Sequence, residues 1–248
     1  MSVSHILSLQ YSDLNTRLEA RCRAIGLAYH CLPTFKINWL PWQQNYPEAL
    51  LQPQDWLIFL SPNAVKGFFN EGPIKFPTRS HLIAIGSGTQ SALIHHTDLP
   101  ILIPSIASSE GILTLPPLQI IAQQTITLIK GTGGRELLQT ELSQRGAIVH
   151  ELLCYQRIPQ SINLACLVKI WQNDQQPLLL ATNNEALNAL IEALPPAVLT
   201  WVLQKPLVVS SERLYHQAMN MGFKCIKHVK QVSETELFNA IVATKDHS

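Results

Sequence analysis

The chain has 248 residues, of which 46% are hydrophobic and 14% are charged, and its formal net charge is +1. This length suits one or two domains, and we favour two. A net charge so close to zero argues against a basic surface for nucleic acid or an anionic membrane, so local dipoles would have to hold an acidic ligand.

Cysteine content and hydropathy restrict the cellular compartment. The five cysteines include no CxxC pair, and their odd number argues against a disulfide framework or a zinc site. No stretch approaches the roughly 18 consecutive apolar residues of a membrane span, and the N-terminus lacks a basic region followed by a long apolar run. We therefore expect a soluble, reduced protein of the cytoplasm.

Short apolar runs alternate along the chain with segments of helical spacing, and small polar residues separate most runs from the next helix. This pattern predicts parallel α/β sheets. Helices are predicted between the runs; Gly26 and Gly146 end two of them, and a capping box from Ser233 to Glu236 opens the last. The segment 159–176 is interpreted as a polar-ended connection. In chain order, the predicted extended segments are residues 5–9, 27–37, 55–60, 81–85, 101–103, 128–130, 147–158, 177–181, 206–209 and 223–229.

The sequence GTGGRE, residues 131–136, lies between a predicted strand and a predicted helix. A dinucleotide-binding fingerprint requires glycine where this chain has Glu136, and no Lys-Ser or Lys-Thr completes a Walker motif. Gly133 and Gly134 still leave backbone N–H groups unshielded at a helix N-terminus, which can hold a carboxylate as well as a phosphate. The alternative is that these glycines only let the strand and helix pack tightly.

Several other turns carry hydrogen-bond donors, and all are expected on the carboxyl edge of a sheet, where ligands of such sheets bind. Taken singly, each is more often an ordinary helix N-cap than a ligand contact. Together they would form an anion-binding rim suited to a polyanionic small molecule. These turns contain Ser61, Pro62 and Asn63; Gly86, Ser87, Gly88 and Thr89; Ser108 and Ser109; and Ser210 and Ser211.

Other chemistry receives little support. No GxSxG motif predicts a serine nucleophile. His95 and His96 are adjacent and so point to different faces, which favours a solvated pair over a metal site. Tyr155 lies where a predicted strand becomes polar; its phenol could donate a proton, or the ring could pack while the hydroxyl stays in water.

Five segments, in this order and spacing, resemble the uroporphyrinogen-III synthase family over nearly the whole chain. They are FLSPNAVKGFF, IAIGSGTQSAL, IASSEGILTLPPL, LIKGTGGRELLQTELSQRGAIVHELLCYQR and LVVSSERLYHQAMNMGF. The resemblance implies two flavodoxin-like parallel α/β domains joined by a two-stranded β-ladder, with the active site in the interdomain cleft. Residues 1–35 with 158–248 would form one domain and residues 36–157 the other.

The resemblance also implies an activity. Enzymes of this family close hydroxymethylbilane, a linear tetrapyrrole with eight carboxylates, to uroporphyrinogen III, with loss of water and inversion of ring D. They use no metal or organic cofactor. For this chain we expect a cytoplasmic monomer that has no nucleic acid or membrane partner, with transient contact to the upstream enzyme that makes the bilane.

Site residues are carried over by position. Tyr155 matches the tyrosine that assists departure of the hydroxyl group. The turns expected to line the cleft contain Ser61, Asn63, Gly86, Thr89, Ser108, Gly133, Thr182, Ser210 and Ser211. The family often has Thr-Arg-Pro after its first strand, whereas this chain has Leu9 and Gln10, so no arginine there can hold a carboxylate.

Two other function classes remain open from the residues alone. A two-domain binding protein could close on an acidic metabolite without catalysis, because such sheets support both roles. A nucleotide-dependent oxidoreductase is the third alternative, and the Glu136 mismatch counts against it.

Overall fold

The structure is a computed structural model, and two compact units divide the chain. Unit 1 comprises Met1–Lys36 and Ile158–Ser248, and unit 2 comprises Ile37–Arg157. The chain therefore leaves unit 1 once and returns to it once. The described residues are 3–9, 13–45, 55–72, 74, 76, 80–134, 136–173, 175–229 and 233–245.

Unit 1 contains, within its described residues, a five-stranded parallel sheet in the order β11-β10-β9-β1-β2. All five residues of β9 are buried, as expected for a strand covered by helices on both faces. The strands are β1 (His5–Ser8), β2 (Ala28–Cys31), β9 (Pro177–Ala181), β10 (Leu207–Val209) and β11 (Ile226–His228).

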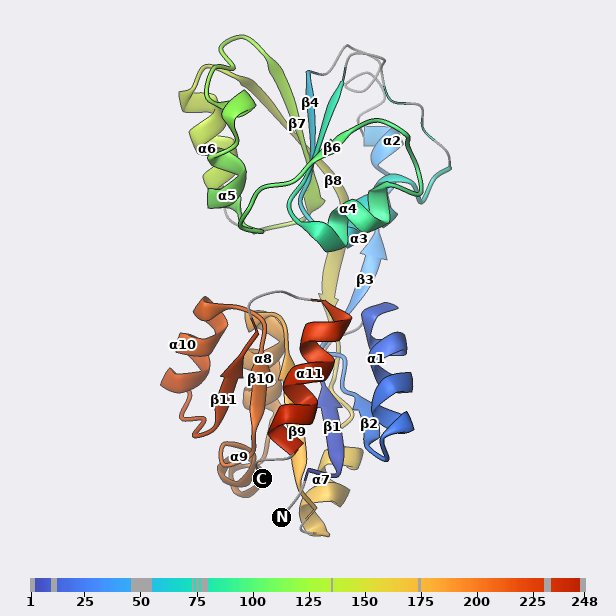
Figure 1. The fold of residues 1–248 in the computed structure, drawn as a ribbon, viewed down its shortest axis with the longest axis vertical. Helices are drawn as coiled ribbons and strands as arrows, with labels where there is room; N and C mark the ends of the chain where they lie inside the picture. The colour runs from blue at the N-terminus through green and yellow to red at the C-terminus, as the bar shows by residue number, and fades with distance from the viewer. Residues whose placement is uncertain are drawn as a thin grey trace. The chain divides into compact units, whose positions relative to one another are not determined.

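Helices cover both faces of this sheet (Figure 1). One apolar cluster joins alternate strand residues to α7, α8, α9 and α10, and a second joins the opposite strand face to α1 and α11. The helices are α1 (Asp13–Ala24), α7 (Ala165–Gln172), α8 (Asn184–Ala193), α9 (Pro196–Val202), α10 (Glu212–Asn220) and α11 (Glu234–Lys245).

Unit 2 is built, in the part of it that the structure describes, on a six-stranded sheet in the order β3-β8-β7-β4-β5-β6. The pairs from β8 to β6 are parallel. The strands are β3 (Phe35–Trp39), β4 (Trp56–Phe59), β5 (His81–Ala84), β6 (Ile101–Leu102), β7 (Thr125–Gly131) and β8 (Ile148–Pro159).

The strands β3 and β8 are neighbours in the sheet, and each contains one boundary between the units. Leu40 N–H donates to the Cys154 carbonyl, and Gln160 N–H donates to the Thr34 carbonyl, both at 3.0 Å. Residue numbers rise along one strand as they fall along the other, so the pair is antiparallel.

The helices of unit 2 also lie on both faces of its sheet (Figure 1). Side chains of α3 and α4 pack with one face, and those of α5, η1 and α6 pack with the other. The helical elements are α2 (Trp42–Asn45), α3 (Pro62–Phe68), α4 (Ser87–Leu93), α5 (Ser109–Leu113), the 3₁₀ helix η1 (Pro116–Leu118) and α6 (Leu137–Gln144).

The predicted α/β architecture with parallel sheets is confirmed, and each predicted extended segment overlaps a strand, although 27–37 overlaps two strands, β2 and β3, of different sheets. Gly26 and Gly146 end their helices with φ of 77° and 83°, as predicted. The interpretation of 159–176 as a connection is wrong, because α7 occupies its centre. Among the described residues, no helix has the length and apolar character that a membrane span requires.

Candidate active site

Predicted site residues of unit 2 lie where its parallel strands end. Ser61 follows β4, Gly86 follows β5, and the glycine-rich turn follows β7. Ser61 caps α3, because its Oγ accepts from the Ala64 N–H at 3.0 Å, and Ser108 caps α5 in the same way from Gly111. The structure therefore places these residues on one edge of the sheet, as expected from parallel topology.

Tyr155 reaches this edge from β8. Its Oη lies 3.0 Å from Ser61 Oγ, and the residue is only 5% exposed. Its ring packs against the backbone of Gly131, where a Cβ would come within 2.6 Å of a ring carbon, and it meets Trp39 edge to face. The alternative of a packed ring with a hydroxyl in water is therefore half right: the ring is packed, but the hydroxyl has a protein partner.

A β-bulge directs Tyr155 toward Ser61. The β7–β8 register is constant from Thr125 to Lys130, which pairs with Leu153, and then shifts so that Gly131 pairs with Tyr155. Cys154 is the extra residue. Strict alternation would place consecutive residues on opposite faces, but here Cys154 and Tyr155 are both buried in the same apolar cluster.

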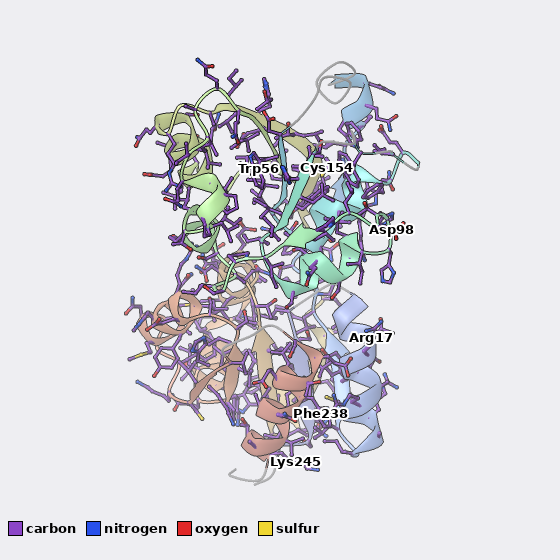
Figure 2. The ribbon with its side chains drawn as sticks, turned by 45° about the horizontal axis from the view of Figure 1, so that its top comes forward. Arg17, Trp56, Asp98, Cys154, Phe238 and Lys245 are labelled. Atoms are coloured by element: carbon purple, nitrogen blue, oxygen red, sulfur yellow. The ribbon has the colours of Figure 1, made fainter. Side chains whose placement is uncertain are left out.

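Cys154 is a packing residue in this bulge, and Figure 2 labels it among the side chains of unit 2. Its thiol contacts the carbonyls of Ala64 and Lys130 at 3.3 and 3.5 Å. Burial raises the pKa of this thiol to about 12, so it stays protonated and unreactive near neutral pH.

The hydrogen bonds of Ser61 and Tyr155 limit which of the two hydroxyls donates and which accepts. Ser61 Oγ already accepts from the Ala64 N–H, and either hydroxyl can donate to the other. When Ser61 donates, the phenol oxygen is an acceptor and its own proton is not used in this contact. The same donor from Ser61 would stabilise the phenolate after that proton leaves.

The GTGGRE turn has left-handed backbone at Gly133 and Gly134, with φ of 74° and 92°. A Cβ on either glycine would meet nothing within 4 Å. These glycines are thus required by conformation, and the alternative that they only allow tight packing does not hold. Glu136 precedes α6 as its N-cap and makes no side-chain cap hydrogen bond.

The remaining candidates of unit 2 differ in accessibility. Asn63 is half-buried in the first turn of α3, and Gly86 is the buried N-cap of α4. Thr89 is only 2% exposed, so a ligand could reach its hydroxyl only after local opening. Its assignment to substrate binding stays a prediction.

Unit 1 has a second polar edge where β9 and β10 end. Ser210 Oγ donates to the Thr182 carbonyl at 3.1 Å, which links the two turns, and Ser210 is 8% exposed. Ser211 is exposed and caps α10, and Asn183 caps α8 through its Oδ1. Thr182, Ser210 and Ser211 were selected from the sequence, but Asn183 was missed, although Asn before a helical segment is itself an N-cap signal.

The described residues contain no group of three or more His, Cys, Asp or Glu side chains placed to hold a metal ion. His95 and His96 are both exposed just after α4, as the sequence predicts, and the His96 ring stacks on Phe69 at 3.9 Å.

A family model described as uroporphyrinogen-III synthase HemD matches residues 16–239. The chain belongs to the uroporphyrinogen-III synthase family. It is 32% identical over 247 residues to the uroporphyrinogen-III synthase of Escherichia coli (strain K12). This alignment covers 95% of this chain and 99% of the relative. The corresponding Salmonella typhimurium enzyme is 34% identical over 246 residues, with the same two coverages.

Solved structures show the fold. A crystal structure of a mutant uroporphyrinogen III synthase from the extremely thermophilic bacterium Thermus thermophilus superposes with a TM-score of 0.65 at 16% identity, covering 97% of this chain and 99% of that one. The predicted membership in the uroporphyrinogen-III synthase family, stated from the five sequence segments, is confirmed.

Proposed function

We propose that this chain is a uroporphyrinogen-III synthase, which closes hydroxymethylbilane to uroporphyrinogen III with loss of water and inversion of ring D. Family membership carries the assignment. The contact between the Tyr155 and Ser61 hydroxyls supports it at the level of chemistry. The purely binding alternative is not favoured, because the matching family model and the relatives are named uroporphyrinogen-III synthases.

Tyr155 is proposed as the proton donor. The C–O bond of the ring A hydroxymethyl group breaks as the pyrrole nitrogen supplies electrons, and the departing oxygen leaves as water with the phenolic proton. The product is an electrophilic azafulvenium cation, which keeps the pyrrole N–H and balances the charge of the phenolate. Ser61 then donates to the phenolate oxygen, which lowers the cost of the charge left on Tyr155.

Ring inversion requires control of conformation. Ring D attacks the azafulvenium cation through its substituted carbon, the resulting spiro intermediate fragments, and the macrocycle closes again with the ring reversed. The last carbon–carbon bond forms at a carbon that loses its proton, and this proton restores the phenol. Uncatalysed closure readily gives the uninverted isomer, so the protein must hold the flexible bilane in one folded conformation.

The polar edges of the units are proposed to hold the eight carboxylates. Backbone N–H groups at Gly133 and the capped helix starts after Ser61 and Ser108 offer donors in unit 2, and Thr182, Ser210 and Ser211 lie in the corresponding turns of unit 1. Donors of this kind suit a chain whose net charge is only +1.

We also propose the finer architecture that the resemblance implies: two domains, β3 and β8 as their two-stranded linker, and a cleft in which both domains contact one substrate. The strand order β2-β1-β9-β10-β11 of unit 1 supports a flavodoxin-like domain. Numbered in chain order, the five parallel strands of unit 2 lie in the order 3-2-1-4-5 (β6-β5-β4-β7-β8), which matches five of the six positions of the other common doubly wound order.

The cellular setting is proposed to be the cytoplasm, with the protein as a monomer. Because the bilane closes spontaneously, transient contact with the enzyme that makes it would shorten the exposure of the substrate. Light scattering measures the oligomeric state, and crosslinking during coupled turnover tests the contact.

The deciding experiment is an isomer assay. The upstream enzyme supplies hydroxymethylbilane, and porphyrin isomers I and III are separated after oxidation. We expect an excess of isomer III over the protein-free control. A ratio of isomer III to isomer I equal to that of the control would refute the proposed function. Calorimetric titration with hydroxymethylbilane would then show whether the chain binds the bilane without catalysis.

A further inference from the structure

Arg213 lies on the polar edge of unit 1, next to residues proposed to hold substrate. It is the second residue of α10, directly after the Ser210–Ser211 turn. Asn184 is the first residue of α8, the helix that follows β9. Because β9 and β10 are adjacent parallel strands, the starts of α8 and α10 lie side by side on the carboxyl edge.

The Arg213 guanidinium is oriented by an amide. With the Asn184 side chain turned so that its oxygen faces Arg213, this oxygen accepts from both Nε and Nη2 at 2.9 Å. One turn further along, Gln217 Nε2 donates to Asn188 Oδ1 at 2.5 Å and ties α10 to α8 again. The Asn184 contact therefore orients the guanidinium from a neighbouring helix, and the Gln217–Asn188 bond joins the same two helices.

The charge of Arg213 is not compensated by these contacts, because an amide oxygen is neutral. Among the described residues, Glu19, Glu151 and Glu234 form ion pairs with cations other than Arg213, and Glu212 lies 4.0 Å from the His216 imidazole. Arg213 is exposed, and a guanidinium has five N–H donors, so the contact with Asn184 leaves donors for a second oxygen group.

We infer that Arg213 binds a side-chain carboxylate of the linear tetrapyrrole and that Asn184 is its positioning residue. The inference rests on the proposed function. It also addresses a feature of the sequence: the four residues that directly follow β1, Leu9 to Ser12, include no arginine or lysine. Arg213 supplies a guanidinium from the turn two strands away in the same sheet.

The test replaces Arg213 with glutamine. Charge-assisted pairs between guanidinium and carboxylate are stronger than neutral hydrogen bonds, so we expect R213Q to raise KM for hydroxymethylbilane about 10-fold, with kcat changed less than about 3-fold and isomer III still the product. Arg213→Lys should recover only part of the loss, because a lysine lacks the planar fork. Arg23→Gln is the matched control: it removes the same charge from an exposed site near the other end of unit 1's strands, and KM should not change.

Asn184 is tested by a double-mutant cycle. N184A should raise KM by a smaller factor than R213Q, and it should have no further effect in the R213Q background, because both changes act on one contact. Thermal unfolding of each variant reports any loss of fold. Equal KM values for wild type and R213Q, with unchanged thermal unfolding, would overturn the inference, as would additive effects in the cycle.

A binding measurement separates this inference from the proposed function. Uroporphyrin III carries eight carboxylates and can be titrated calorimetrically without turnover. A wild type that binds it but makes no excess of isomer III would refute the proposed function, while weaker binding by R213Q in the same titration would still support the carboxylate site. Equal binding by both proteins, or no binding by either, would overturn it.

Discussion

The hydroxyls of Tyr155 and Ser61 form a contact between residues 94 positions apart in sequence. Replacing Tyr155 with phenylalanine removes the proton donor but keeps the packed ring. We expect turnover to fall by roughly 10- to 1,000-fold, the range for a lost general acid, while the thermal unfolding temperature changes little. The isomer assay measures the first quantity and calorimetry the second. Unchanged turnover would restrict Tyr155 to a packing role.

Gly131 offers an independent test of the position of Tyr155. A methyl group there would lie within 2.6 Å of the tyrosine ring, so Gly131→Ala should displace the phenol from Ser61 and lower turnover. It should also cost about 1 to 3 kcal/mol in the free energy of unfolding, as for other overpacked sites. The loss of stability should be smaller in a Tyr155→Ala background, where the space is open. Equal losses in both backgrounds would contradict the contact.

At the residue scale, the sequence could predict which side chains carry donors but not which of them meet. Ser61, Ser108 and Ser211 were identifiable because N-caps have a local signal. The Ser61–Tyr155 contact depends on the bulge at Cys154, and alternation along LLCYQR gives no sign of a bulge. Arg213 was overlooked for a related reason: its orientation comes from Asn184 on another helix.

At the scale of elements, helices α7 and α9 are two that sequence signals for helix ends did not predict. The N-cap residues are Leu164 for α7 and Pro195 for α9, and neither makes a side-chain cap hydrogen bond. Pro196 begins α9 at a position that suits proline, although a Pro-Pro pair is more readily taken as the end of the preceding helix. Asn163 Oδ1 accepts from the Ala165 N–H at the start of α7, at 3.0 Å, and both helices pack with one face of unit 1's sheet, so tertiary contacts add to the local signals.

The strands β1 and β2 place two imidazoles in contact. His5 Nδ1 lies 3.1 Å from His30 Nε2. Burial lowers the pKa of both groups, and the charge of His5, with that of Arg23, further lowers the pKa of His30, whereas Glu19 raises it. The fold therefore favours the neutral imidazoles.

This pair predicts a pH dependence of stability. The pKa values of both histidines in the folded state lie below the unfolded value of about 6.5. The contribution of the neutral pair to the free energy of unfolding is therefore complete above about pH 6.5, and it is lost as the pH falls through the folded-state pKa values. Urea unfolding at pH 7.5 and pH 5 should show a smaller pH difference in a His5→Gln, His30→Gln double variant than in the wild type. His150→Gln, at an exposed position on β8, is the control. An unchanged difference in the double variant would exclude the pair as a cause.

At the scale of the whole molecule, each unit has its own apolar clusters. Both clusters of unit 2 consist of residues between Ile37 and Tyr155, and those of unit 1 lie in the two flanking segments. The local pattern does not mark the division, because both crossings are strands rather than Gly- or Pro-rich linkers. The domain boundaries expected from the sequence therefore came from the family resemblance.

Separate clusters predict that unit 2 folds alone. A protein of residues 37–157 should show a single cooperative unfolding transition by circular dichroism, because it is continuous and retains the residues of its two clusters. It should not give isomer III, since the turns of unit 1 are missing. Residues 1–36 fused directly to 158–248 provide the reciprocal protein. Absence of a cooperative transition in the first protein would show that unit 2 depends on its partner.

The insertion of unit 2 between β1–β2 and β9 also sets an order of events at the ribosome. β1 pairs with β9, whose first residue is Pro177, so one edge of β1 stays unpaired while more than half of the chain is translated. Unit 2 is complete by residue 157 and can fold meanwhile as a unit. Its antiparallel β3–β8 pair would then bring the two halves of unit 1 together and shorten the loop that the last strands must close.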